Sequence, residues 1–340
     1  MSKKQFGTPI LFVVFNRPDT TKLVFDEIKK IQPMRLFIAA DGPRQNNQRD
    51  AEGCRLTREI VSNIDWPCEV KTLFRDTNLG CKYAVSSAFD WFFNNTEEGI
   101  ILEDDDLPDQ SFFPFCEELL EKYRNDTRIM HISGNNFQHK NKDFKCNDSY
   151  YFSNISHIWG WATWRRAWKY YNVELEEWPE MRERKKLNNI FNNNAVTFMW
   201  AKTFQKYYDK KINSYDGQWV FACLHHNGLC INPAVNLVSN IGFGNNATHT
   251  NESSNDEFAN LLTKEIIFPL KHPLKIEVDY EADNYTLKYL FNINRYWTQR
   301  IKWFLKLNFT KPYMFFKKHY YKIFFGKETN DEKNLLSLVK

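Results

Sequence analysis

Four consecutive acidic residues, Glu103 to Asp106, are the densest group of potentially catalytic side chains in this sequence. They follow the apolar run Gly-Ile-Ile-Leu, and adjacent carboxylates at the end of a buried strand raise each other's pKa unless a cation neutralises them. Mn²⁺ or Mg²⁺ would suit them, because these ions bind one or two carboxylates together with phosphate oxygens and water. A solvated acidic turn that caps a helix beginning near Ser111 is the alternative. The position of the acids after a buried strand favours the metal site.

The elements that would position these acids follow from an alternation of short apolar runs and amphipathic stretches over residues 9–133. This pattern is typical of an α/β fold with a mostly parallel sheet. We expect strands at 9–15, 35–40, 69–74, 99–103 and 128–133, and helices at 20–31, 49–63, 81–94 and 112–124. In such open sheets ligands bind beyond the carboxyl ends of the strands. Polar residues that follow each strand are therefore the candidates for a binding site.

Such residues follow the first three strands as well as the fourth. They are Arg17, Asp41 and Asn78, and Lys82 comes shortly afterwards, in the third predicted helix. Each has an ordinary alternative: Arg17 and Lys82 as solvated charges at helix starts, and Asp41 and Asn78 as turn formers. Suitable residues at the ends of four strands together favour a common site.

Residues 99–113 resemble the D-x-D region of nucleotide-sugar-dependent glycosyltransferases of the GT-A type. They are most similar to the Glu-Asp-Asp form found in N-acetylglucosaminyltransferase I and its bacterial relatives, where a Phe-Phe pair follows at the same distance. The resemblance implies a GT-A fold, a UDP-sugar donor and Mn²⁺ or Mg²⁺. It places Asp104 at the donor and the metal on Asp105, while the additional acid Asp106 leaves the ligand open between these last two positions.

The resemblance extends to the other strand ends, and it covers roughly residues 8–255. It implies that Arg17 contacts the diphosphate or uridine and that Asp41 recognises the uracil ring. Asn78 and Lys82 lie where the family closes over the nucleoside. These four roles are expectations from the family.

Three further residues belong to the predicted acceptor side. Trp161 lies in a segment similar to the family's Gly-Trp segment near the sugar, where an indole face suits pyranose C–H groups, although a core position is the alternative. Residues 215–219 resemble the neighbourhood of the family's catalytic base, which maps onto Asp216, with Gly217 in place of a second acid. His249 lies in the loop expected over the donor and would contact the diphosphate or the metal; a solvated histidine is equally compatible.

These assignments predict a metal-dependent glycosyltransferase that transfers a sugar from a UDP-sugar to a hydroxyl of a saccharide. A single base acting in a direct displacement predicts inversion at the anomeric carbon. Two other classes remain as alternatives: a metal-dependent phosphatase or nuclease, and a non-catalytic saccharide-binding or adhesin-like protein. The sequence offers no second acidic cluster of equal density for a two-metal hydrolase.

The formal net charge of +4 hides a basic segment. Residues 288–327 contain ten Lys or Arg, no Asp or Glu, and 14 of the 56 aromatic residues. Basic and aromatic side chains suit an anionic membrane surface, which we favour, and a lipid-linked saccharide is then the expected acceptor. Packing on the catalytic body is the alternative, and binding of nucleic acid is unlikely in this context.

The domain prediction is a GT-A catalytic domain over 1–255, with a donor half at 1–133 and an acceptor half at 134–255, and a helical basic extension over 256–340. No apolar run approaches the ~18–20 residues of a spanning helix, and the beginning of the sequence lacks the features of a signal peptide. Seven cysteines without a C-x-x-C pair indicate reduced thiols. We therefore expect a cytoplasmic enzyme of polysaccharide biosynthesis, peripheral at the inner face of a bacterial cytoplasmic membrane.

Overall fold

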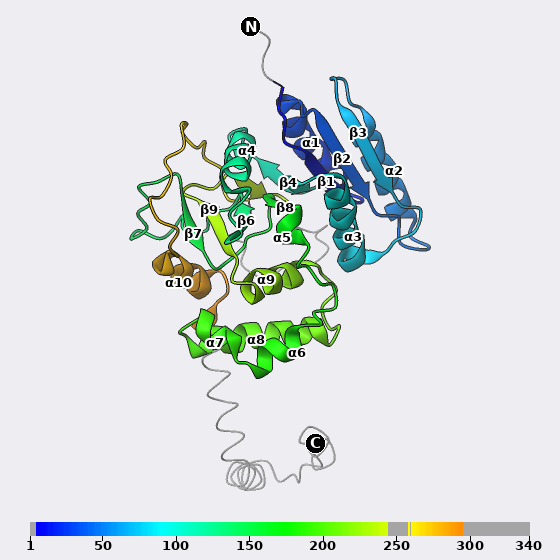
Figure 1. Cartoon of the computed structure of the whole chain (residues 1–340). Helices are drawn as coiled ribbons and strands as arrows, with labels where there is room; N and C mark the ends of the chain where they lie inside the picture. Colours follow the sequence, from blue (N-terminus) through cyan, green and yellow to red (C-terminus); the bar gives the residue numbers. More distant parts are fainter. Residues whose placement is uncertain (1–4, 244–257, 259, 295–340) are drawn as a thin grey trace, which may run out of the picture. The chain divides into compact units, whose positions relative to one another are not determined.

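The computed structural model describes residues 5–243, 258 and 260–294 (Figure 1). All nine elements predicted in the first part of the chain are present, with bounds that differ by two residues at most. The strands are β1 (Ile10–Val14), β2 (Arg35–Ala40), β3 (Glu69–Phe74), β4 (Glu98–Glu103) and β6 (Ile129–Ser133). The helices are α1 (Pro18–Ile31), α2 (Gln48–Ser62), α3 (Gly80–Asn95) and α4 (Phe112–Tyr123).

The central sheet has eight strands in the order β3-β2-β1-β4-β8-β6-β9-β7. The later strands are β7 (Tyr150–Ser153), β8 (Trp161–Trp164) and β9 (Leu229–Pro233). The first four strands in this order are parallel, as are β6 and β9, whereas β8 and β7 run antiparallel to their neighbours. This Rossmann-like, mostly parallel sheet flanked by helices confirms the predicted α/β class.

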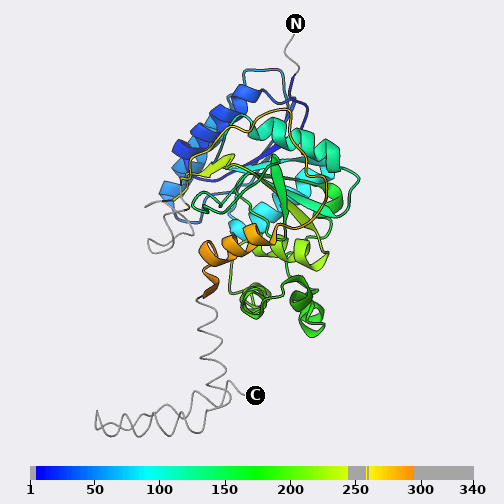
Figure 2. The same ribbon diagram turned by 90° about the vertical axis from the view of Figure 1, so that its left-hand side faces the viewer.

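Helices cover both faces of the sheet (Figures 1 and 2). Side chains alternate along β1: Phe12 is buried in one core with Phe25 of α1 and Leu119 of α4. Leu11 points to the opposite core, where it joins Phe89 of α3 and the residues of later helices. Because a strand directs successive side chains to opposite faces, this one short apolar strand anchors both layers.

The second half of the chain adds further helices and a strand that completes a small sheet. The helices are α5 (Arg165–Trp168), α6 (Trp178–Glu183), α7 (Lys186–Ile190), α8 (Asn194–Tyr208), α9 (Asp216–His225) and α10 (Tyr280–Tyr289). The small sheet pairs β5 (Asp106–Pro108) with β10 (Val238–Asn240). This pairing draws the segment after β10 back to the end of β4, where the acidic residues lie.

The first compact unit extends to Phe291, beyond the predicted domain boundary at residue 255. Ile266 and Leu270 are buried in the same core as α1 and α4. In α10, the Asp283 carboxylate accepts a hydrogen bond from the backbone N–H of Asn154. These contacts make residues 260–291 part of the body rather than of a separate extension.

Most of the predicted basic segment, residues 295–327, lies outside the described residues, as does His249. Among the helices that are described, none combines the length and apolar character required to cross a membrane. All seven cysteines are free thiols.

Candidate active site

A cleft of about 860 Å³ lies at the carboxyl ends of β1, β2 and β4. Its volume is in the range of small-molecule binding sites. Several of the predicted site residues line it, together with Glu103 and Trp159: they are Arg17, Asp41, Asn78, Asp104, Asp105 and Asp216. Residues that are separated by up to 199 positions in the sequence thus meet at the edge of the sheet where the strand pattern predicts a site.

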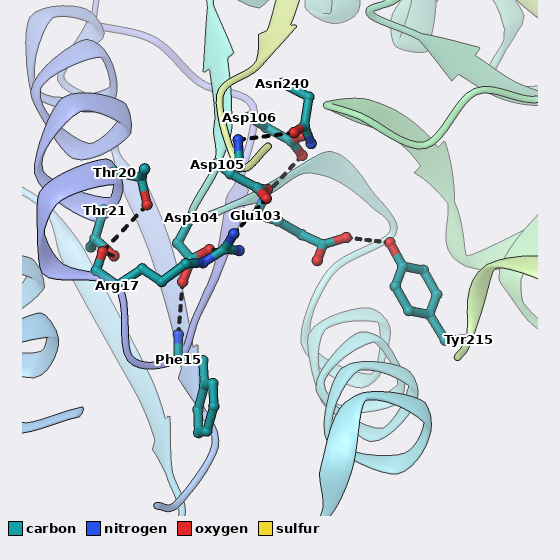
Figure 3. Close-up of polar contacts among 11 residues, drawn as sticks. Phe15, Arg17, Thr20, Thr21, Glu103, Asp104, Asp105, Asp106, Tyr215 and Asn240 are labelled. Atoms are coloured by element: carbon teal, nitrogen blue, oxygen red, sulfur yellow. Dashed lines mark hydrogen bonds and ion pairs between the residues drawn. The ribbon is translucent and has the colours of Figure 1, made fainter. Parts of the chain in front are cut away.

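The Arg17 guanidinium lies between two of the acidic side chains (Figure 3). Its Nη1 donates to Asp105 Oδ2 at 2.9 Å, and its Nη2 donates to Asp104 Oδ1. Asp104 also accepts from the backbone N–H of Phe15 at 3.1 Å. Burial lowers the pKa of Arg17, but the two carboxylates outweigh this effect and raise it. Arg17 therefore keeps its positive charge, and its side chain lines the cleft.

One guanidinium does not balance all the acids. Burial and the charge of Asp105 raise the pKa of Glu103 to about 8, although Tyr215 donates a hydrogen bond to its carboxylate. Burial also raises the pKa of Asp104 to about 6, against the opposing effect of Arg17. A site that holds this excess of acid favours either bound protons or a second cation.

Asp106 has a different environment from its neighbours. Its side chain is buried, and Oδ2 accepts from the backbone N–H of Glu103 at 3.0 Å and of Gly160 at 2.8 Å. Burial, then the charges of Asp105 and Glu103, raise its pKa well above the ordinary value. Oδ1 has no hydrogen-bond partner among the described residues. Asp106 thus links the end of β4 to the turn before β8 through Oδ2. Oδ1 has no described partner and is therefore the oxygen that could bind a metal.

The residues present fit a hard divalent cation. Asp105 lines the cleft and keeps 16% of its side chain exposed, and its carboxylate is the ligand type that Mn²⁺ and Mg²⁺ prefer. The raised pKa values of Glu103 and Asp104 show an acid excess that such an ion would relieve. The metal assignment of Asp105 and Asp106 remains a prediction, with Asp105 as the more accessible ligand.

The segment after β10 passes directly over Asp105. The backbone N–H of Ile241 donates to the Asp105 carbonyl oxygen at 2.8 Å. Next to it, a β-carbon at Gly242 would lie 1.9 Å from Asp105 Oδ2 and 2.8 Å from Arg17 Nη1. A larger residue here would require the Asp105 and Arg17 side chains to shift, so the identity of residue 242 is coupled to the geometry of the acidic cluster.

Asp41 fixes the loop that precedes α3. Its carboxylate accepts from the Asn78 side chain at 2.9 Å and from the backbone N–H groups of Leu79 and Gly80 at 3.0 and 3.1 Å. Both carboxylate oxygens are therefore occupied, and the first N–H groups of the helix gain an acceptor. The structure gives Asp41 and Asn78 a positioning role, and their contacts with a nucleoside remain predictions.

Lys82 does not line the cleft. Its side chain is 5% exposed and its Nζ lies 3.1 Å from Glu174 Oε1, which anchors α3 to the segment before α6. A buried ammonium requires such a partner. Its expected contact with the nucleoside remains a prediction that this arrangement does not support.

Trp161 is fully buried in the core and does not reach the cleft. Its ring stacks on His131 with centroids 5.1 Å apart and lies 5.5 Å from Trp219. The sugar contact expected from the resemblance therefore does not fit the structure. Trp159, which sequence reasoning did not select, lines the cleft instead. The chain bends between the two indoles at Gly160, which has a φ of +63°.

Asp216 is the first residue of α9 and lines the cleft. Its Oδ1 accepts from the Tyr207 hydroxyl at 2.9 Å and from the Ser214 hydroxyl. The positive end of the helix dipole also favours a carboxylate at this position. A β-carbon at Gly217 would lie 2.1 Å from the Tyr207 ring, so a larger residue at this position would require the ring to move.

No protein-family model matches this chain. No curated protein sequence matches it either. Matching solved structures include 4-diphosphocytidyl-2C-methyl-D-erythritolsynthase from Anaerococcus prevotii, with 9% identity, a TM-score of 0.29, and coverage of 48% of this chain and 74% of that one.

Two other matching structures carry names from nucleotide-sugar chemistry. An apo UDP-glucose pyrophosphorylase has 9% identity and a TM-score of 0.33 over 66% of this chain and 89% of its own. Mouse xyloside xylosyltransferase 1 has 12% identity and a TM-score of 0.30 over 66% and 84%, respectively. These values carry no argument about activity, and none of the three shows a relation to N-acetylglucosaminyltransferase I.

Proposed function

We propose that this protein is a metal-dependent, inverting glycosyltransferase that moves a sugar from a UDP-sugar to a hydroxyl of a saccharide acceptor. The observation that carries the proposal is the convergence of Arg17, Asp105 and Asp216 on one cleft at the carboxyl edge of the sheet. Such a cleft offers a cationic group and a metal-binding carboxylate for a diphosphate, and a separate carboxylate for an acceptor hydroxyl. The cleft thus contains residues suited to bind the donor diphosphate and a residue suited to deprotonate the acceptor.

The donor side is formed by Arg17 and Asp105. A diphosphate is a better partner for a guanidinium than a single carboxylate is, because it offers several charged oxygens in a bidentate geometry. Donor binding would therefore draw Arg17 from Asp105 toward the phosphates and leave this carboxylate for the cation. When bound, Mn²⁺ or Mg²⁺ would supply Lewis acid chemistry to the leaving diphosphate.

The acceptor side is formed by Asp216, Tyr207 and Ser214. The two hydroxyls bind Oδ1 and hold the carboxylate in place. Oδ2 can then accept the proton of an acceptor hydroxyl as that oxygen attacks the anomeric carbon. One base acting in a single displacement implies inversion of configuration. Trp159 lines the same cleft and offers an indole face to a sugar ring.

Measurement of UDP release from UDP-sugars tests the proposal. The purified full chain is incubated with Mn²⁺ and, separately, with each of a panel of UDP-sugars, and free UDP is measured over time. We expect slow hydrolysis of one sugar nucleotide, which a saccharide acceptor accelerates and a chelator abolishes. Absence of UDP release from every donor, alongside hydrolysis of a phosphate ester or DNA, would replace the proposal with a hydrolase.

We further propose that the acceptor is lipid-linked and that the enzyme acts in polysaccharide biosynthesis at the inner face of the cytoplasmic membrane. Support comes from composition alone, namely ten basic and no acidic residues over 288–327. Sedimentation with anionic and neutral vesicles tests it, with a chain truncated after residue 294 as the comparison. Binding to anionic vesicles that truncation does not reduce would remove this part of the proposal.

A further inference from the structure

A second cluster of potential metal ligands lies at the opposite end of α9 from Asp216. It consists of Glu177, which precedes α6, and of His225 and His226, where α9 ends. We propose that these three residues form a binding site for a divalent transition metal such as Zn²⁺. The nine helical steps from Asp216 to His225 span about 14 Å along the axis, so this site is distinct from the acidic cluster in the cleft.

The distances within the cluster fit coordination better than hydrogen bonding. His225 Nε2 lies 3.6 Å from Glu177 Oε1, and His226 Nε2 lies 3.7 Å from Glu177 Oε2. One ligand atom from each residue falls within 4.8 Å of the others. Protein N–H···O bonds are shorter, ~2.7–3.2 Å. Two ligands at ~2.0–2.2 Å from one tetrahedral Zn²⁺ lie about 3.4 Å apart. Each histidine nitrogen already lies near this separation from one Glu177 oxygen, and no pair of ligand atoms need approach by more than about 1.4 Å.

Packing holds the two imidazole rings in place. The His225 ring stacks on Phe221 with centroids 5.3 Å apart and an interplanar angle of 17°. The His226 ring stacks on Tyr170 at 4.0 Å and 24°. The side chains of His225 and His226 are 13% and 25% exposed, and Glu177 is 44% exposed. The two imidazoles therefore lose little side-chain freedom on binding, and an ion can enter from the exposed side of Glu177.

The charges around the cluster include two that favour a cation and one that opposes it. Negative helix-dipole charge accumulates at the carboxyl end of α9, beside both histidines. Lys186 opposes it, but its ammonium is hydrogen bonded to the His225 carbonyl oxygen. The Glu177 carboxylate supplies one full negative charge to the site.

The types of ligand atom in the cluster indicate which metal it would bind. Two imidazoles and one carboxylate suit Zn²⁺ and its neighbours, whereas Mg²⁺ prefers oxygen ligands alone. Three protein ligands leave a fourth position for water. The chain would thus bind two classes of cation at separate places, a hard ion in the cleft and a transition metal between α6 and α9.

Titration of the chelator-treated full chain with Zn²⁺ tests the proposal, using a chromophoric competitor in excess Mg²⁺ after alkylation of accessible thiols. We expect a site of one Zn²⁺ per chain. His226→Gln and Glu177→Gln should weaken it at least about 10-fold, since even residues behind metal ligands change affinity by ~10–100-fold. His272→Gln is the matched control: its Nε2 lies 3.2 Å from Glu118 Oε1, and the described residues offer this pair no third ligand.

Equal affinity and stoichiometry in the wild type and in both variants would overturn the proposal. X-ray absorption of the zinc-loaded wild type gives an answer even if a variant does not fold. Two imidazole nitrogens in the zinc shell support the site, and a shell of sulfur or of oxygen alone refutes it. The assay does not involve UDP-sugars, so its result is independent of the proposed activity.

Discussion

Gly242 and Asp105 are in such close contact that a β-carbon on residue 242 would lie 1.9 Å from the Oδ2 atom of Asp105. This contact joins the segment after β10 to the acidic cluster at the end of β4. The same β-carbon would also meet the Arg17 guanidinium. The three residues form one unit, in which the backbone of the first limits where the charges of the other two can lie.

Gly242→Ala is therefore expected to displace the Asp105 carboxylate and to reduce metal-dependent UDP binding at least about 10-fold, while the fold is kept. Asp105→Asn should cause a similar loss. Calorimetric titration with UDP in the presence of Mn²⁺ measures both. The control is Gly7→Ala, where a β-carbon would meet no atom closer than 3.6 Å. Normal UDP binding by the Gly242 variant would contradict the coupling.

Asp216→Asn is expected to lower turnover by about 10²–10⁴-fold, the usual contribution of a general base, without a loss of donor binding. The amide keeps the size of the side chain and can still accept from Tyr207, but it cannot take up a proton. Steady-state kinetics and UDP titration measure the two properties separately. Asp26→Asn, at an exposed i,i+4 ion pair in α1, is the control. A variant that loses UDP binding as well would remove Asp216 from the role of base.

Stability of the metal-free protein should fall as the pH rises from about 5 to 8. The pKa of Glu103 is about 8 in the folded state against an ordinary 4.5, so in this range the folded state binds the proton more tightly than the unfolded state. One such group lowers the free energy of unfolding by at most about 1.4 kcal/mol per pH unit. Asp104, with a pKa of about 6, adds to the slope at the lower end.

Urea unfolding at several pH values checks this dependence, and Glu103→Gln should flatten it because glutamine does not titrate. Mn²⁺ with UDP should also flatten it, since a bound cation favours the ionised carboxylates. Stability that rises with pH over this range in the metal-free protein would contradict the expected excess of acid.

Truncation of two tryptophans that are separated by one residue should affect different properties, stability for Trp161 and acceptor binding for Trp159. Trp161→Ala removes a fully buried ring and is expected to cost about 3–5 kcal/mol of stability. Trp159→Ala affects a ring that lines the cleft and should raise the KM for the acceptor with a much smaller change in stability. Thermal unfolding and acceptor kinetics distinguish them, and an unchanged KM in the Trp159 variant would count against its role.

The sequence predicted the donor half of the fold well because each element there carries a local signal. The short apolar runs at β1 and before Glu103 predict buried strands, and parallel strands direct their carboxyl ends to one edge. Arg17 and Asp105 follow two of these strands and were selected on that basis, whereas Asp216 was selected from the resemblance of residues 215–219 to a catalytic-base segment. The structure brings all three to one cleft.

The remaining features depend on long-range geometry that no local pattern encodes. Trp159 and Trp161 are the same residue type in the same segment, and the sequence does not show which one faces the cleft. In the structure the chain bends at Gly160 between them, and Trp159 lines the cleft. The partner that buries Lys82 is Glu174, 92 positions away. The cluster of Glu177 with His225 also joins residues far apart in the sequence, so neither could be found by spacing.

The antiparallel strand β8 lies between β4 and β6 in the central sheet. During synthesis β4 therefore leaves the ribosome well before its second neighbour exists, and one edge of an apolar strand stays unpaired in the meantime. Such edges attract other strands, and pairings between distant segments form slowly. A nascent chain that ends near residue 133 would expose this edge, so the donor half depends on the rest of the body to complete its sheet and is poorly suited to expression on its own.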